Sequence, residues 1–272
     1  MPELPEVENY RRKLEPIVVG KRVESAKVVK RNYAFLSSPQ TIRRQLNGKS
    51  IRSIERHGKY LLFKIGKEEG TLLVHLGMTG QLFSRDYVPD KHVHLTLNLK
   101  GSRYPLYFRD PRKFGKLLWI SAGREKHEPR LSKLGIDALK LTPSYLAEKI
   151  QARKCAIKTL LLDQGVVAGI GNIYADEALF RSGVRPTRAA QKLDENETKL
   201  LAKAVKDILK RAIKLGGSSI NDYIHPDGSL GYFQIEHQVY GRAGEECRKC
   251  SEKIKRKVLG QRSSHYCPSC QK

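Results

Sequence analysis

The sequence has no uninterrupted apolar stretch long enough to cross a lipid bilayer, which argues against an integral membrane protein. Charged side chains crowd the first twenty residues, a composition that a secretory signal peptide does not have. The 272 residues contain neither an internal repeat nor a low-complexity segment. We therefore expect a cytoplasmic protein with one large or two medium-sized folded domains.

Acidic residues are also scarce, because 28 Asp and Glu side chains stand against 52 Lys and Arg, which leaves a net charge of +24. Solubility alone does not require so large an excess. The usual partner of such a charge is a polyanion, which the cationic side chains neutralise. We therefore expect a nucleic acid as the partner, no membrane, and a cytoplasmic location at the nucleoid.

Cysteine is rare until the end of the chain, since four of the five cysteines lie in the last 26 residues. They form two pairs, Cys247 with Cys250 and Cys267 with Cys270, and sixteen residues separate the pairs. This spacing favours one structural Zn²⁺, because four thiolates close the coordination sphere of the metal. A redox dithiol is the less favoured alternative. Cys155 is isolated, and we expect it to be a small buried residue.

Two types of pattern divide the chain. From about residue 21 to residue 120, short apolar runs alternate with polar residues and turns, which predicts a packed β-sandwich with an N-terminal helix against it. The second half is mainly helical in pattern. Thr142 before a proline marks one helix start, and Asp194 with Glu197 forms a capping pair at another.

The predicted fold class is therefore α+β and multidomain. We expect an N-terminal catalytic β-sandwich domain over 1–135, a helical DNA-binding domain over 136–234 and a zinc hairpin over 235–272.

The N-terminus reads Met1-Pro2-Glu3-Leu4-Pro5-Glu6, and a proline after the initiator is small enough to allow removal of Met1. The nitrogen of Pro2 is then a secondary amine that can attack a carbon and form an iminium. Glu3 and Glu6 are close enough in sequence to move protons for this amine. On these residues alone, an ordinary capped helix is the favoured interpretation, because Pro5 suits the first helical turn.

Three further motifs are candidates for contact with a nucleic acid. A glycine-rich turn before Asn172 is expected to present backbone N–H groups to a phosphate, and Lys158 could contact the same region. Met78 lies between glycines, and Arg112 and Phe114 are two residues apart. These three are either turn and core residues or groups that wedge a duplex and fill a vacated base position.

In this order, the motifs resemble those of the bacterial formamidopyrimidine-DNA glycosylases over essentially the whole chain. The motifs that carry the resemblance are Pro-Glu-Leu-Pro-Glu-Val-Glu, His-Gly-Lys-Tyr, Asp-Pro-Arg-Lys-Phe-Gly, Gly-Ile-Gly-Asn-Ile-Tyr, Gly-Gly-Ser-Ser-Ile and the four-cysteine hairpin. Leu4 and Val7 favour this branch over the related endonuclease VIII branch, which typically has glycine in place of Leu4. Lys113 stands where many members have arginine, which keeps the positive charge.

The resemblance implies a role for each motif. Pro2 would attack C1′ of the damaged nucleotide, and Glu3 would move protons with help from Glu6. Lys59 would contact the phosphate beside the lesion, and Arg262 would hold the backbone from the hairpin. The residues implied to contact DNA are Met78, His92, Arg112, Phe114, Lys158, Asn172, Ser218, Ser219 and Arg262.

The activity implied is excision of oxidised purines from double-stranded DNA by a monomer, followed by β- and δ-elimination. The resemblance also implies a helix-two-turn-helix element, a DNA-binding cleft between the domains, and a loop within 216–232 that closes over the flipped base. Two alternatives stay open: excision of oxidised pyrimidines, as in the endonuclease VIII branch, and a non-catalytic zinc-containing DNA-binding protein.

Overall fold

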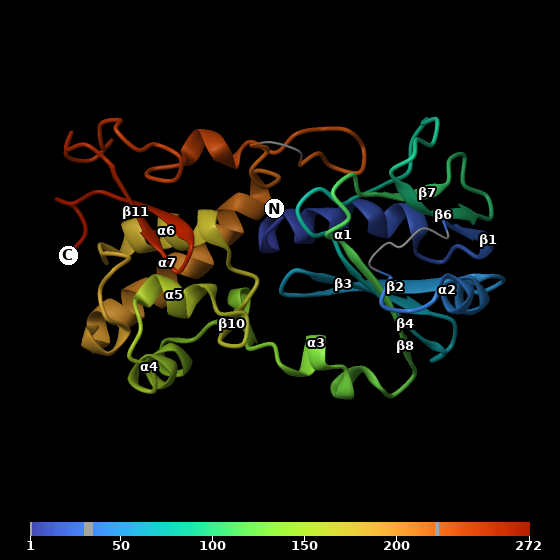
Figure 1. The fold of residues 1–272 in the computed structure, drawn as a ribbon, viewed down its shortest axis with the longest axis horizontal. Coiled ribbons are helices and arrows are strands. Elements are labelled where there is room, and N and C mark those ends of the chain that lie inside the picture. The colour runs from blue at the N-terminus through green and yellow to red at the C-terminus, as the bar shows by residue number, and fades with distance from the viewer. Residues whose placement is uncertain (1, 30–34, 221–222) are drawn as a thin grey trace. The chain divides into compact units, whose positions relative to one another are not determined.

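The computed structural model describes residues 2–29, 35–220 and 223–272, which form two compact units (Figure 1). The first unit comprises Met1–Ser132 and Gly216–Tyr232, and the second comprises Lys133–Leu215 and Phe233–Lys272. Gly216–Tyr232 thus folds with the N-terminal half of the chain, whereas the predicted domains grouped it with the helices. The physical reason is a set of hydrogen bonds between this segment and the first helix, Leu4–Val18.

The first unit contains two antiparallel four-stranded sheets that face each other. One sheet has the order β2 Ile51–His57, β3 Tyr60–Ile65, β4 Gly70–His75 and β8 Lys116–Ser121. The other has the order β1 Val23–Val28, β6 Val93–Leu99, β7 Leu106–Arg109 and β5 Gln81–Phe83. These strands confirm the predicted sandwich.

Apolar side chains fill the space between the sheets and the helices α1 (Leu4–Val18) and α2 (Pro39–Leu46). Val7, Tyr10 and Leu14 recur at helical spacing on α1 and are at most 1% exposed. They share one core with Phe63 and Phe108 of the two sheets. Burial of each such side chain stabilises the fold by about 1.5–3 kcal/mol, so the predicted helix is an integral part of the sandwich.

Two loops carry the chain from one sheet to the other, and strand pairing places them side by side. Residues 76–80 join β4 to β5, and residues 110–115 join β7 to β8. The last residue of β4 lies opposite the first of β8, and the first residue of β5 lies opposite the last of β7. The backbones touch at Gly77, where a β-carbon would come within 2.5 Å of the Gly115 nitrogen.

The second unit is mainly helical, as predicted. Its helices are α4 Pro143–Gln151, α5 Ile157–Leu162, α6 Asn172–Ser182 and α7 Glu195–Lys214, with 3-10 turns at Ala138–Lys140, Ala190–Lys192 and Phe233–Glu236. The hydroxyl of Thr142 accepts a hydrogen bond from Tyr145 N at 3.2 Å, and Asp194 and Glu197 form a capping box. Both predicted helix starts are therefore confirmed. They could be predicted because a capping side chain and the backbone group that it caps are close in sequence.

Short elements complete the chain. A 3-10 turn at Glu125–His127 and helix α3 (Pro129–Ser132) end the first unit, and the two-residue strands β9 (Ile136–Asp137) and β10 (Val167–Ala168) pair in parallel. The antiparallel hairpin of β11 (Lys255–Leu259) and β12 (Arg262–Tyr266) lies near the C-terminus. Across the part of the chain that the structure describes, no helix has the length and apolarity needed to span a bilayer.

Candidate active site and nucleic-acid interface

The N-terminus is held by a reciprocal capping box on helix α1. The side chain of Glu3 accepts a hydrogen bond from the backbone of Glu6, and the Glu6 Oε2 atom accepts one from Glu3 N at 2.8 Å. Pro2 is buried, and the two carboxylates are only 3% and 2% exposed. The residues predicted to act at the nucleophile are therefore brought together in a site from which most water is excluded.

Glu6 also holds the start of the segment 216–232. Its Oε1 atom accepts a hydrogen bond from Ser218 N at 2.8 Å. Gly217, with φ of +82°, allows this approach, since a β-carbon there would lie 2.7 Å from Glu6 Oε1. Ser219 Oγ donates to Tyr223 O at 3.0 Å and accepts from Gly231 N at 2.9 Å, which closes the base of the segment. Glu6 is thus a positioning group as well as a capping one.

The same segment is fixed further along helix α1. Tyr10 donates its hydroxyl to Ile224 O at 2.7 Å, and its ring meets the Tyr223 ring edge-on at 5.7 Å between centroids. Lys13 forms an ion pair with Asp227 at 2.6 Å. These contacts explain why the segment belongs to the first unit.

Lys59 occupies the two-residue turn between β2 and β3 and is largely buried. Burial and the nearby Lys59 ammonium lower the pKa of His75 to about 4. His75 is therefore neutral near pH 7, and its Nδ1 atom accepts a hydrogen bond from Gly77 N at 3.1 Å. This bond places the loop that carries Met78.

The two loops between the sheets present their large side chains to solvent. Met78 is 40% exposed and Phe114 is 48% exposed, so neither is a core residue. Arg112 is exposed, and its guanidinium carbon lies 5.0 Å from the centre of the Phe114 ring, a cation–π contact. His92 is half-buried, and its carbonyl accepts a hydrogen bond from Asp110 N at 2.9 Å. Met78 and Phe114 therefore expose the apolar surface that a wedge requires.

Asn172 begins helix α6, where backbone N–H groups lack helical partners. Gln164 holds the preceding turn, because its side chain accepts from Gly169 N at 3.0 Å and donates to Ile170 O at 2.8 Å. The Oδ1 atom of Asn172 is buried and has no hydrogen-bond partner among the described residues. An amide in this position suits the phosphate contact that was expected, with its nitrogen as the donor.

Lys158 requires a correction, because its side chain is completely buried and does not reach a phosphate from this position. Its Nζ atom lies 2.7 Å from Asp176 Oδ1 and donates to Ser263 O at 2.7 Å. Asp176 in turn accepts a hydrogen bond from His265 N at 2.9 Å. Lys158 therefore ties helices α5 and α6 to strand β12 and stabilises the fold.

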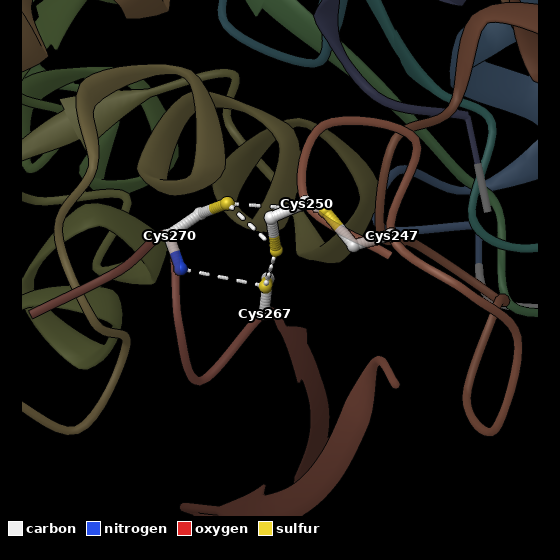
Figure 2. A group of neighbouring side chains, drawn as sticks. All are labelled: Cys247, Cys250, Cys267 and Cys270. Carbon is white, nitrogen blue, oxygen red and sulfur yellow. Dashed lines mark hydrogen bonds between the residues drawn. The ribbon is translucent and has the colours of Figure 1, made fainter. Parts of the chain in front are cut away.

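The four cysteines converge at one point of the second unit (Figure 2). Their sulfur atoms all lie within 4.8 Å of one another, and the closest pairs are 3.3, 3.4 and 3.9 Å apart. A tetrahedral zinc with bonds of about 2.3 Å sets its sulfurs about 3.8 Å apart, so this thiolate set fits Zn²⁺. Four protein ligands leave no position for water, which makes the site structural.

The hairpin of β11 and β12 carries exposed basic residues. Arg262 is the first residue of β12, lies opposite Leu259 and is exposed. Lys255, Arg256 and Lys257 on β11 are exposed as well. The hairpin thus offers several cations to a phosphate backbone, including the one that was predicted.

Two buried carboxylates that organise these elements were not predicted from the sequence: Asp110 and Asp176, both 0% exposed. The signal for Asp110 was available, since an acidic residue directly follows an apolar strand in a chain that has few acids. The partner of Asp176 could not be found in this way, because Lys158 and strand β12 approach it only in the folded protein.

Comparison with known proteins identifies the family. A family model for the formamidopyrimidine-DNA glycosylase N-terminal domain matches residues 1–117, and one for the H2TH domain matches residues 134–223. A zinc finger found in FPG and IleRS matches residues 244–272. The formamidopyrimidine-DNA glycosylase of Magnetococcus marinus is 43% identical over 277 residues, which cover 100% of both chains.

The chain belongs to the formamidopyrimidine-DNA glycosylase family. Its fold is similar to that of the MutM (FPG) protein from Thermus thermophilus, with a TM-score of 0.89, 38% identity, and coverage of 99% of this chain and 98% of that chain. It is also similar to a Lactococcus lactis FPG variant in complex with DNA that contains Fapy-dG, with a TM-score of 0.91, 38% identity and full coverage of both chains. The resemblance inferred from the sequence motifs is confirmed.

Proposed function

We propose that this protein excises oxidised purines from double-stranded DNA with the mature nitrogen of Pro2 as the nucleophile, and then cleaves the abasic site. Membership of the family makes it a DNA glycosylase with lyase activity that acts in base excision repair. The observation that supports the residue assignment is the pair of buried carboxylates, Glu3 and Glu6, at the N-terminus. Burial of a carboxylate is costly, and a DNA-binding module without chemistry does not need it there.

The reaction begins when the Pro2 nitrogen forms a bond to C1′ and the glycosidic bond breaks, so that the base leaves with the electron pair. The nitrogen then loses its proton and the departing base gains one. Glu3 delivers a proton to O4′ as the sugar ring opens, which gives the iminium. Loss of a proton from C2′ then expels the 3′-phosphate, and a second elimination expels the 5′-phosphate. Glu6 contributes by holding Glu3 N and Ser218 N in place.

Three exposed side chains form a void-filling group, by which we mean Met78, Arg112 and Phe114. Extrusion of a base costs a few kcal/mol of stacking and pairing, and the vacated position must be filled. Met78 and Phe114 offer apolar surface to the neighbouring bases, and Arg112 can donate to the orphaned partner base. The cation–π contact between Arg112 and Phe114 keeps the two together.

Other residues hold the DNA backbone in this proposal. Lys59, Asn172 and Arg262 contact phosphates around the lesion, and His92 lies beside the void-filling group through its bond to Asp110. Ser218 and Ser219 shape the segment that receives the flipped base. Since duplex DNA is the substrate, we place the protein at the nucleoid.

The thiolates of Cys247, Cys250, Cys267 and Cys270 would hold one zinc ion, which supplies folding energy to the hairpin and no chemistry. Arg262 gains its position from that hairpin.

Borohydride trapping on a duplex with one 8-oxoguanine tests the proposed nucleophile. Reduction of the iminium should join protein to DNA, and peptide mass mapping should place the adduct on Pro2. Glu3→Gln should still bind the lesion duplex and lose base excision, because the amide keeps the shape and removes the proton carrier. An adduct that maps only to an internal lysine contradicts the assignment of Pro2.

A further inference from the structure

Asp110 lies where the chain leaves strand β7, and both oxygens of its buried side chain bind neighbouring loops. Its Oδ1 atom accepts the hydroxyl of Thr79 at 2.6 Å, and its Oδ2 atom accepts Gly115 N at 2.7 Å. Thr79 follows Met78 in one loop, and Gly115 follows Phe114 in the other. One carboxylate therefore links the two loops that carry the void-filling group.

The backbone of Asp110 extends this link to a third stretch of chain, at the start of strand β6. Its N–H donates to His92 O at 2.9 Å, and its carbonyl lies 3.0 Å from His94 Nε2. Because a carbonyl can only accept, His94 Nε2 must carry the proton. Asp110 thus connects the three stretches of chain that contain Met78, His92 and the Arg112–Phe114 turn.

Thr79 also forms a second hydrogen bond, with the backbone of Arg112 in the other loop. Its Oγ1 atom donates to the carboxylate and accepts from Arg112 N at 3.3 Å. Thr79 is only 7% exposed, so water does not readily replace either bond. The hydroxyl therefore sets the distance between the backbone after Met78 and the backbone at Arg112.

We infer that Asp110 and Thr79 are positioning residues for base extrusion, which fix the spacing between Met78 and the Arg112–Phe114 pair. This inference rests on the proposed function of the void-filling group. Charge-assisted hydrogen bonds to a buried carboxylate are short and directional, so they can hold exposed side chains in one arrangement before DNA binds. Both residues are buried, with Asp110 0% and Thr79 7% exposed, so the role inferred for them is exerted through the loops that they hold.

Thr79→Val tests the inference, because valine has the shape of threonine and lacks the hydroxyl. The measurement is single-turnover excision of 8-oxoguanine from a duplex, beside cleavage of a pre-formed abasic site and the melting temperature. Excision should fall by about tenfold to a hundredfold, since a misplacement of about 1 Å can slow an enzyme reaction by about a hundredfold. Cleavage of the abasic site should stay within about twofold, because no base must be extruded there.

Two control variants accompany it. Thr79→Ser restores the hydroxyl and should return excision close to the wild-type rate. Thr96→Val makes the same change at a half-buried position on strand β6 and should leave excision unchanged. Equal slowing of excision and abasic-site cleavage by Thr79→Val, or a matching fall in melting temperature, would show that Thr79 acts on the fold alone and would overturn the inference.

Phe114→Ala separates this inference from the proposed function on which it rests. If Phe114→Ala leaves excision unchanged, the void-filling proposal itself is wrong. If Phe114→Ala slows excision and Thr79→Val does not, only the positioning role is wrong. If both are right, the slowing in the double variant should be less than the product of the two single effects, since both changes act on one group of contacting residues.

Discussion

Whether a lysine binds DNA or stabilises the fold depends on its partners, as Lys158 shows. In the sequence, this lysine lies near a turn that is expected to bind a phosphate, and a DNA contact is a reasonable expectation from that position. In the folded chain its ammonium lies 2.7 Å from Asp176, and both side chains are 0% exposed. The fold depends on both partners of an ion pair that is shielded from solvent, because removal of one leaves the other charge buried and uncompensated.

We therefore expect Lys158→Met to destabilise the protein by about 3–5 kcal/mol, since the Asp176 carboxylate loses its counter-charge. Thermal unfolding should show a clearly lower melting temperature. Below that temperature, the dependence of DNA affinity on salt should match that of the wild type. A phosphate contact would behave in the opposite way, with normal stability and a salt slope lowered by about 1.

Lys203→Met is the matched control for this experiment. Lys203 pairs with Asp207 on the surface of helix α7, with its side chain 71% exposed. Such pairs contribute about 0–1 kcal/mol, so the melting temperature should barely change.

At the scale of elements, the sequence predicts what neighbouring residues determine. The helix starts at Thr142 and Asp194 follow from capping side chains a few residues from the groups they cap. The sandwich follows from alternating strands, and the four-sulfur cluster follows from cysteine spacing. Each of these signals is contained in a short stretch of chain.

What the sequence does not predict depends on pairs that are distant along the chain. The loops at 76–80 and 110–115 become neighbours only because β4 pairs with β8 and β5 pairs with β7. Strand order cannot be worked out from alternation, so the link from Asp110 to Thr79 was not foreseen. The docking of Gly216–Tyr232 on helix α1 was missed for the same reason.

The zinc hairpin is an element whose stability we expect to depend on its metal. Cys250→Ser should lose zinc and DNA affinity together, because loss of one ligand releases the hairpin that carries Arg262. Metal content by atomic spectroscopy and binding to a lesion duplex measure the two effects. Cys155→Ser is the control, since Cys155 lies outside the cluster and its replacement should change neither quantity. Full affinity in a metal-free preparation would contradict this prediction.

At the scale of the whole molecule, the net charge of +24 has a measurable consequence. Each phosphate that a cation neutralises releases a counterion, so the logarithm of affinity falls with the logarithm of salt concentration by about 0.9 per contact. With about five contacts the slope is about −4.5. Titrations of a lesion duplex at several salt concentrations should give a slope of this size.

Arg262→Met should make that slope shallower by about 1, because it removes the phosphate contact that we propose for the hairpin. Lys203→Met again serves as the control and should leave it unchanged. A nearly flat response of the wild type would show that the positive charge serves something other than DNA binding.

The first unit is built from two separate stretches of the chain, which affects the order in which its parts fold during synthesis. The first unit contains Met1–Ser132, but it also needs Gly216–Tyr232, which leaves the ribosome only after 83 residues of the second unit, Lys133–Leu215. Until then, the Glu6 carboxylate cannot accept its hydrogen bond from Ser218 N, and the Tyr10 hydroxyl cannot donate to the Ile224 carbonyl. Contacts between residues more than 200 positions apart form late, since domains fold as the chain emerges. A nascent chain that still lacks this segment therefore carries an unfinished site around Glu6, and the surroundings of the proposed nucleophile at its first residues are completed almost last.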